Sequence, residues 1–183
     1  MTPTIREIVT EALAHELESF DLYTDLAEVA PTEGLRDFCS ELAGQEKGHV
    51  EKIIAAISAE QTPEFQEALA DALALLAAHE QGKSDEGQLD QPSSSRSLAR
   101  ALLISTQLAF TSSDGKALAP EAVAALSRKV LDAALVKETD SIARFERLER
   151  HAGDPRCRQL LSALRVSEQK HKDDLERRRR RLD

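Results

Sequence analysis

The chain has 183 residues, a length that suits one domain with a real hydrophobic core. Hydrophobic residues make up 41% of the composition and aromatic residues only 3%, and Ala, Leu, Glu, Arg and Lys dominate. This composition favours helices over strands. The formal net charge of −9 argues against general nucleic-acid binding.

The cysteine pattern and the search for targeting signals bear on where in the cell the protein is expected. We recognise no signal peptide and no apolar run long enough to span a bilayer, so we expect no membrane partner. The two cysteines, Cys39 and Cys157, form no Cys-x-x-Cys pair and suggest no disulfide framework. A cytoplasmic location is the simplest for such a chain. We interpret both cysteines as small helix residues and not as reactive thiols.

Residues 4–58 have the pattern of a helical hairpin. Thr4 and Glu7 form a capping-box pattern, which predicts a helix start, and apolar residues then recur at helical spacing. The stretch Ala-Pro-Thr-Glu-Gly at 30–34 breaks this pattern and predicts a tight turn between antiparallel helices. The two helices are expected over residues 4–29 and 33–58.

Residues 60–119 are predicted to form an insert of helices and loops. Thr62 and Pro63 match the cap and first turn of a helix. The helix that follows is rich in Ala and Leu and is predicted to end at about Glu80. We interpret His79, near this end, as a surface residue.

The second part of the insert has two contrasting stretches. Residues 81–96 are polar and contain Gly, Asp, Ser and Pro, which predicts a linker or long loop. Residues 98–111 are predicted to form an apolar helix with no carboxylate on its buried side. Such a helix would pack on the outside of the core or on a partner chain, so we expect a homodimer.

Residues 120–181 have the pattern of a second hairpin. Pro120 opens a long helix that is predicted to continue to about His151, and Gly-Asp-Pro at 153–155 turns the chain. The last helix ends in five arginines, Arg177–Arg181. These cations complement the negative end of the helix dipole. Contact with phosphate groups of nucleic acid or lipid is the alternative interpretation, although we expect no nucleic-acid partner.

Each hairpin contains one Glu-x-x-His motif, in which the two side chains lie on one helix face about 5–6 Å apart and can bind one metal ion. One such motif alone is a weak signal, because Glu and His are common on solvated helix faces. Here each motif follows another glutamate by 30 residues, and every equivalent pair is separated by 122 residues. These pairs are Glu16 and Glu138, Tyr23 and Phe145, Glu46 and Glu168, and His49 and His171.

Two hairpins can bury their four apolar stripes together as a four-helix bundle. Four glutamates and two histidines interrupt these stripes at mid-height. Carboxylates in a dry interior repel one another unless cations or other partners neutralise them. Six such ligands suit two metal ions. Taken singly, each glutamate would be a solvated residue and each histidine a structural one, but that alternative does not explain the matching offsets.

Hard carboxylates with one imidazole per ion favour iron or manganese over a structural zinc ion. Tyr23 lies two turns from Glu16 and can hydrogen-bond a ligand carboxylate. The simpler interpretation is that Tyr23 is an ordinary side chain of the hydrophobic core, and this is the only interpretation available for Phe145. The predicted ligands are Glu46 and Glu168 as bridges, Glu16 and Glu138 as terminal carboxylates, and His49 and His171 as one imidazole per ion.

This arrangement resembles the rubrerythrin-like branch of the ferritin-like di-iron superfamily. In that family a glutamate seven residues before an aromatic residue, followed about thirty residues later by Glu-x-x-His, occurs once in each half. The resemblance covers about residues 5–58 and 127–178 and does not explain the insert. It implies a ferritin-like fold over the whole of 1–183 and two iron ions, with manganese or a mixed pair as variants. It also implies oxidation of Fe(II), or reduction of peroxide or dioxygen, in iron or oxidative-stress handling.

The chain departs from rubrerythrins proper at two points. It has no rubredoxin module with Cys-x-x-Cys knuckles, so catalysis would need an external electron donor. It also has Ser141 where those proteins have an additional glutamate that is associated with peroxidase-type cycling. The site is therefore similar to simpler ferritin-like centres, which oxidise Fe(II). A different class of function is a non-catalytic helical module that holds metal or binds a partner.

Overall fold

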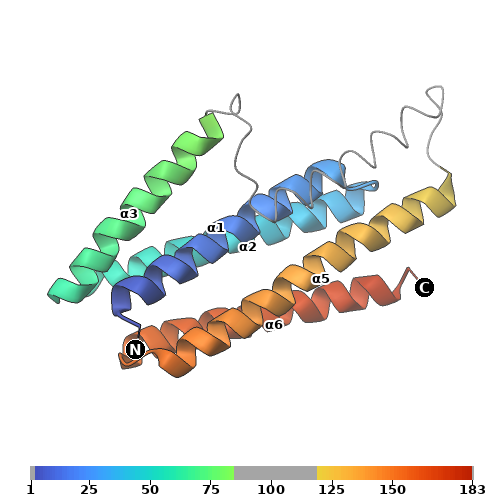
Figure 1. Cartoon of the computed structure of the whole chain (residues 1–183). Coiled ribbons are helices and arrows are strands. Elements are labelled where there is room, and N and C mark those ends of the chain that lie inside the picture. The colour runs from blue at the N-terminus through green and yellow to red at the C-terminus, as the bar shows by residue number, and fades with distance from the viewer. Residues whose placement is uncertain (1–2, 85–118, 183) are drawn as a thin grey trace.

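The computed structural model describes residues 3–84 and 119–182, and all regular structure within these ranges is helical (Figure 1). The prediction of an all-α chain is confirmed for this part. The helix expected over 98–111, and most of the linker expected over 81–96, lie outside the described residues. The helices are α1 (Ile5–Val29), α2 (Glu33–Ser58), α3 (Pro63–Ser84), α5 (Pro120–His151) and α6 (Pro155–Arg180).

Side chains that cap the first backbone N–H groups fix where three of these helices begin. The Thr4 hydroxyl accepts from the backbone N–H of Glu7, whose carboxylate accepts in return from the backbone of Thr4, as the capping-box pattern predicted. The Thr32 hydroxyl accepts from the backbone of Leu35 at the start of α2. Asp154 caps α6 in the same way.

Helix α3 differs from the prediction in its end and in the position of its histidine. It continues to Ser84 and not to about Glu80, because one glycine in the last turn costs a helix only about 1 kcal/mol. His79 is not a free surface residue. Its Nε2 lies 3.0 Å from Asp21 Oδ2, and its ring packs edge-on against Phe20. Both partners belong to α1, against which α3 packs.

The helices form two hairpins that face each other. Helices α1 and α2 pack side by side, as do α5 and α6, and α1 and α2 both contact α6 across the space between the hairpins (Figure 1). Helix α3 packs mainly on the first hairpin, against α1 and α2, and its Phe65 ring also contacts the Arg156 guanidinium of α6. No helix in the described part of the chain is long and apolar enough to cross a membrane.

The buried apolar side chains form two separate clusters along the hairpins. One cluster includes Leu26, Phe38, Leu42, Val130 and Leu175, and the other includes Leu13, Ile53, Phe65, Phe145 and Leu164. On α2, α5 and α6 the predicted metal ligands lie in the stretch between the two clusters, and on α1 Glu16 lies next to Leu17, at the edge of the second cluster. The apolar layers therefore close off a polar level from both ends.

Both cysteines lie inside these apolar clusters, which leads to a first prediction. Burial raises the pKa of the Cys39 thiol to about 12 and that of the Cys157 thiol to about 11. Since the thiolate is the reactive form, iodoacetamide at pH 8 is expected to label the native protein at least about 100-fold more slowly than the urea-unfolded protein. Mass spectrometry of timed samples measures both rates. Rapid labelling of either cysteine in the native state would contradict this packing.

Candidate metal centre

The six predicted ligands converge at the polar level between the two apolar clusters. Each of the four long helices contributes to this level, and no member of the group is more than 3% exposed. Full burial of four carboxylates is unusual, because charged groups are rarely buried without partners. The residues are Glu16 on α1, Glu46 and His49 on α2, Glu138 on α5, and Glu168 and His171 on α6.

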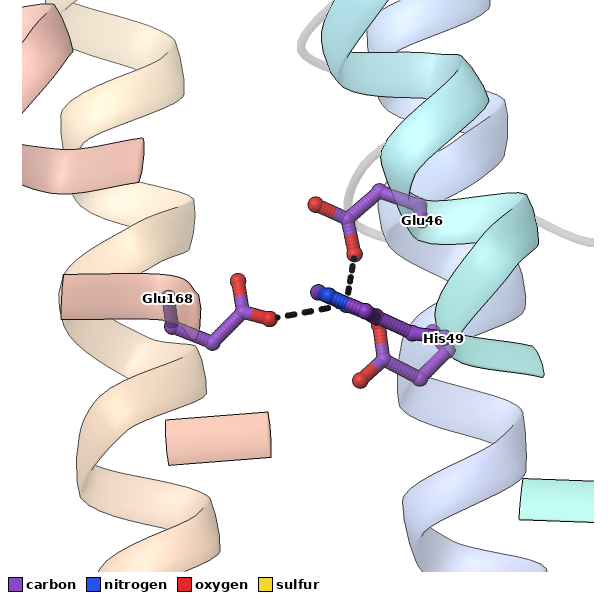
Figure 2. A group of neighbouring side chains, drawn as sticks. Glu46, His49 and Glu168 are labelled. Carbon is purple, nitrogen blue, oxygen red and sulfur yellow. Dashed lines mark hydrogen bonds and ion pairs between the residues drawn. The ribbon is translucent and has the colours of Figure 1, made fainter. Parts of the chain in front are cut away.

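The first group surrounds the Nδ1 atom of His49. Figure 2 shows Glu46 and His49 on α2 facing Glu168 on α6. His49 Nδ1 lies 3.0 Å from Glu168 Oε1 and 3.3 Å from Glu46 Oε2. It also lies 3.3 Å from Glu16 Oε2. We call this group of four side chains the His49 position.

The second group surrounds the Nδ1 atom of His171 in the same way. His171 Nδ1 lies 3.2 Å from Glu46 Oε1 and 3.4 Å from Glu168 Oε2. Glu138 Oε2 is the third neighbour, at 3.8 Å. We call these four side chains the His171 position. The two imidazole rings are stacked, with centroids 5.5 Å apart and planes 12° from parallel.

Glu46 and Glu168 belong to both positions. Each directs one carboxylate oxygen at the His49 ring and its other oxygen at the His171 ring. Within each position the candidate ligand atoms lie within 4.8 Å of one another. Each group can therefore hold a metal ion, and the shared carboxylates have the geometry of bridges between two ions.

The hydrogen bonding of the group leaves ligand atoms unused. Only one carboxylate can accept the single Nδ1–H of His49, and that one is Glu16, through Oε2. The buried ligand atoms without a hydrogen-bond partner are Glu16 Oε1, both oxygens of Glu46, Glu138 Oε2, Glu168 Oε1 and His171 Nδ1. Orphaned buried oxygens cost stability, and divalent cations that prefer oxygen and imidazole ligands would satisfy all of them.

Two of the four glutamates have raised pKa values and the other two have lowered ones. Burial raises the pKa of Glu16 and of Glu138 well above 4.5, and the charges of Glu46 and Glu168 add to this. For Glu46 and Glu168 burial acts in the same direction, but contacts with His171 and His49 outweigh it and lower the pKa. Without metal, the shared carboxylates are therefore the charged ones.

Both histidines are held in the protonated form when no cation is present. Burial lowers the pKa of His49, but Glu16, Glu168 and Glu46 outweigh it and raise that pKa to about 12. For His171, contacts with Glu168 and Glu46 likewise outweigh burial and raise the pKa to about 9. Protons thus balance the carboxylates in the metal-free protein, and metal ions would displace them.

Each imidazole is held from behind by the opposite hairpin. His49 Nε2 lies 2.8 Å from Ser167 Oγ, and His171 Nε2 lies 2.7 Å from Gln45 Oε1. With Nδ1 directed inward as a ligand atom, Nε2 carries the proton and donates it to these oxygens. Sequence reasoning missed both partners. The signal was present, because Gln45 and Ser167 each directly precede the glutamate of a motif and are 122 residues apart.

The Tyr23 hydroxyl forms its hydrogen bond with the far hairpin and not with its own. It donates to Glu138 Oε1, and the Tyr23 ring is fully buried. Tyr23 therefore hydrogen-bonds one of the predicted ligand carboxylates. Phe145 occupies the equivalent place in the second hairpin and offers no hydroxyl to Glu16. The two halves of the centre are consequently alike in their ligands and different in this contact.

A second buried network, which sequence reasoning did not identify, joins α1 to α5. Lys137 Nζ lies 3.3 Å from His15 Nδ1, and His15 Nε2 lies 2.7 Å from Ser141 Oγ. Burial lowers the pKa of His15 to about 3, helped by the charges of Lys137 and Arg144. Neutral His15 accepts from Lys137 and donates to Ser141. His15 and Lys137 again lie 122 residues apart.

Three of the five arginines at the end of α6 line a surface cavity of about 300 Å³, which Gln45 also lines; they are Arg177, Arg178 and Arg181. Arg177 pairs with Asp174 one turn earlier, and the Arg178 guanidinium lies 3.8 Å from the centroid of the Phe38 ring. Arg179 pairs with Asp132 on α5, and Arg180 pairs with Glu176 on its own helix. Four of the five arginines therefore have partners within the protein. Contact with phosphate remains a prediction.

Comparisons with family models, with curated proteins and with solved structures found no significant match. The buried Glu and His groups are compatible with a ferritin-like protein.

Proposed function

We propose that the chain is a ferritin-like di-iron-carboxylate protein that oxidises Fe(II) with dioxygen or peroxide. The observation that supports this most directly is the pair of carboxylates, Glu46 and Glu168, that each direct one oxygen at either histidine. Two ferrous ions held by such bridges would supply the two electrons that reduce hydrogen peroxide to water. In this proposal the two hairpins form a four-helix bundle around the centre.

The residues around the centre suit this role. The apolar layers above and below it keep water away from the ligands, as the burial of all six shows. Ser167 and Gln45 hold the imidazoles in the orientation in which Nδ1 faces inward. Ser141 is bound to His15 and to the Lys137 carbonyl. A serine there adds no carboxylate ligand, which favours Fe(II) oxidation over peroxidase cycling, and turnover would require an external reductant.

A stoichiometric iron experiment tests the proposal. Metal-free protein is loaded anaerobically with ferrous iron, and desalted samples are analysed for iron; about two ions per chain are expected. Addition of peroxide or air should then oxidise both ions, followed by the near-ultraviolet absorbance of ferric iron and by the loss of ferrous iron that ferrozine detects. Iron that binds but is not oxidised faster than free Fe(II) would indicate a non-catalytic metal-holding module instead.

A further inference from the structure

We propose that the two metal positions are inequivalent: the His49 position binds its ion more tightly and fills first, and Tyr23 weakens the His171 position. This inference rests on the proposed dinuclear centre and concerns what residues of this chain do to it. It begins from a difference between the halves at a residue that hydrogen-bonds a ligand carboxylate, a tyrosine at 23 and a phenylalanine at 145.

Tyr23 occupies one oxygen of a terminal carboxylate. Its hydroxyl donates to Glu138 Oε1, whereas Glu138 Oε2 has no hydrogen-bond partner and lies 3.8 Å from His171 Nδ1. Both side chains are buried, so water cannot take over the role of the hydroxyl. Glu138 is therefore left with one oxygen for an ion, and the hydrogen bond draws negative charge from that carboxylate.

Glu16 has no such restraint. Its Oε2 lies 3.3 Å from His49 Nδ1, and its Oε1 has no hydrogen-bond partner. The equivalent of Tyr23 in the other hairpin is Phe145, which carries no hydroxyl. Because carboxylates bind cations through one oxygen or through both, Glu16 is free to supply two ligand atoms.

The difference changes the number of protein ligand atoms at each position. The His49 position can supply one nitrogen, one oxygen from each shared carboxylate and two oxygens from Glu16. The His171 position can supply the same nitrogen and shared oxygens but only one oxygen from Glu138. An ion at the His171 position would therefore have one fewer charged oxygen from the protein, and an external ligand could take that place.

The remaining contacts of the ligands are balanced between the positions. Each imidazole has one outward oxygen partner, at 2.8 Å for His49 and 2.7 Å for His171. Glu46 and Glu168 serve both positions alike. The tyrosine is therefore the contact on which the asymmetry depends, and it can be removed with little disturbance. Phenylalanine already fills the equivalent site as Phe145, fully buried.

Anaerobic titration of the metal-free full chain with cobalt(II), followed by visible absorbance against a competing chelator, tests the inference. We expect two binding steps whose affinities differ by about 10-fold or more, the size of effect that residues contacting metal ligands commonly have. Tyr23→Phe should bring the two steps together. His49→Ala and His171→Ala each leave one position intact. Tyr23→Phe should raise cobalt affinity by about 10-fold in the His49→Ala background and leave it unchanged in the His171→Ala background.

The outcomes separate this inference from the proposed function. Two cobalt ions bound in one unresolved step, or a Tyr23→Phe effect that falls on the His49 position, would overturn the inference and leave the dinuclear centre standing. A chain that binds no cobalt at the buried level would overturn the proposed function itself. Thermal unfolding of each metal-free variant shows whether it is folded, and the matched pair of histidine variants ensures that each position is measured on its own.

Discussion

Replacing Glu46 and Glu168 together by glutamine is expected to abolish the stabilisation that manganese(II) gives to the native protein. A ligand that binds only the folded state adds about 2.7 kcal/mol at one hundred times its dissociation constant. Two such ions should raise the melting temperature by roughly 10–20 °C for a chain of this size. Because both shared carboxylates contribute to both positions, the double variant should lose nearly all of that shift.

Differential scanning calorimetry with and without manganese measures this effect. The matched control is Glu51→Gln/Glu146→Gln, which removes the same number of charges from exposed positions on α2 and α5. That control should keep the full shift. If the Glu46→Gln/Glu168→Gln protein kept it as well, the ions that stabilise the chain would be bound at surface carboxylates and not between the hairpins.

The free energy of unfolding of the metal-free protein should fall as the pH rises from about 6.5 to 9. The stabilisation that bound metal adds should instead grow over the same range. Contacts with carboxylates raise the pKa of His171 from 6.5 to about 9 and that of His49 to about 12. A raised pKa in the folded state gives stability that is complete below pH 6.5 and is lost as the pH passes through the folded value. For His171 alone this amounts to on the order of 3 kcal/mol.

The four buried glutamates determine how the stability of the metal-free protein depends on pH at acidic pH. Glu16 and Glu138, whose pKa values burial raises, act in the same direction as the histidines above pH 4.5. Glu46 and Glu168 have lowered pKa values, so their contribution is lost as the pH falls below 4.5. The metal-free protein should therefore be most stable near pH 4.5, and the loss of stability above that pH should continue through the range in which the histidines titrate.

Urea unfolding at a series of pH values, with and without manganese, tests this profile. Metal binding needs deprotonated ligands, so manganese should stabilise the protein more at pH 8 than at pH 6. The two stability curves should diverge as the pH rises. A metal-free protein that gains stability between pH 6.5 and 9 would show that its histidines are not held in the protonated form.

The sequence was most informative about features that depend on residues of a single helix. Periodicity and capping residues located the hairpin helices, because Thr4, Pro120 and Asp154 act on their own helix ends. The common offset of 122 brought together the six ligand candidates, since equivalent positions in two similar hairpins lie at the same level. Contacts between hairpins could not be obtained in this way.

The partners of Tyr23 and of the two imidazoles illustrate that limit. Helical spacing places Tyr23 on the same face as Glu16, but its hydroxyl meets Glu138 on α5. Gln45 and Ser167 lie beside the apolar stripes and not within them, so their sequence positions resemble those of ordinary solvated residues. Their role depends on which side chain of the other hairpin faces them, and helix periodicity contains no information about that.

The crossed support of the imidazoles bears on how such a chain can arise. Each metal position takes ligands from both hairpins, and each histidine is oriented by a residue of the opposite one. A shorter ancestor with a single hairpin would complete the centre only by pairing with a second copy of itself, and both copies would then be identical. Fusion of two such units would allow the halves to diverge. Tyr23 opposite Phe145 is a difference of this kind, because two identical chains would have the same residue at both places.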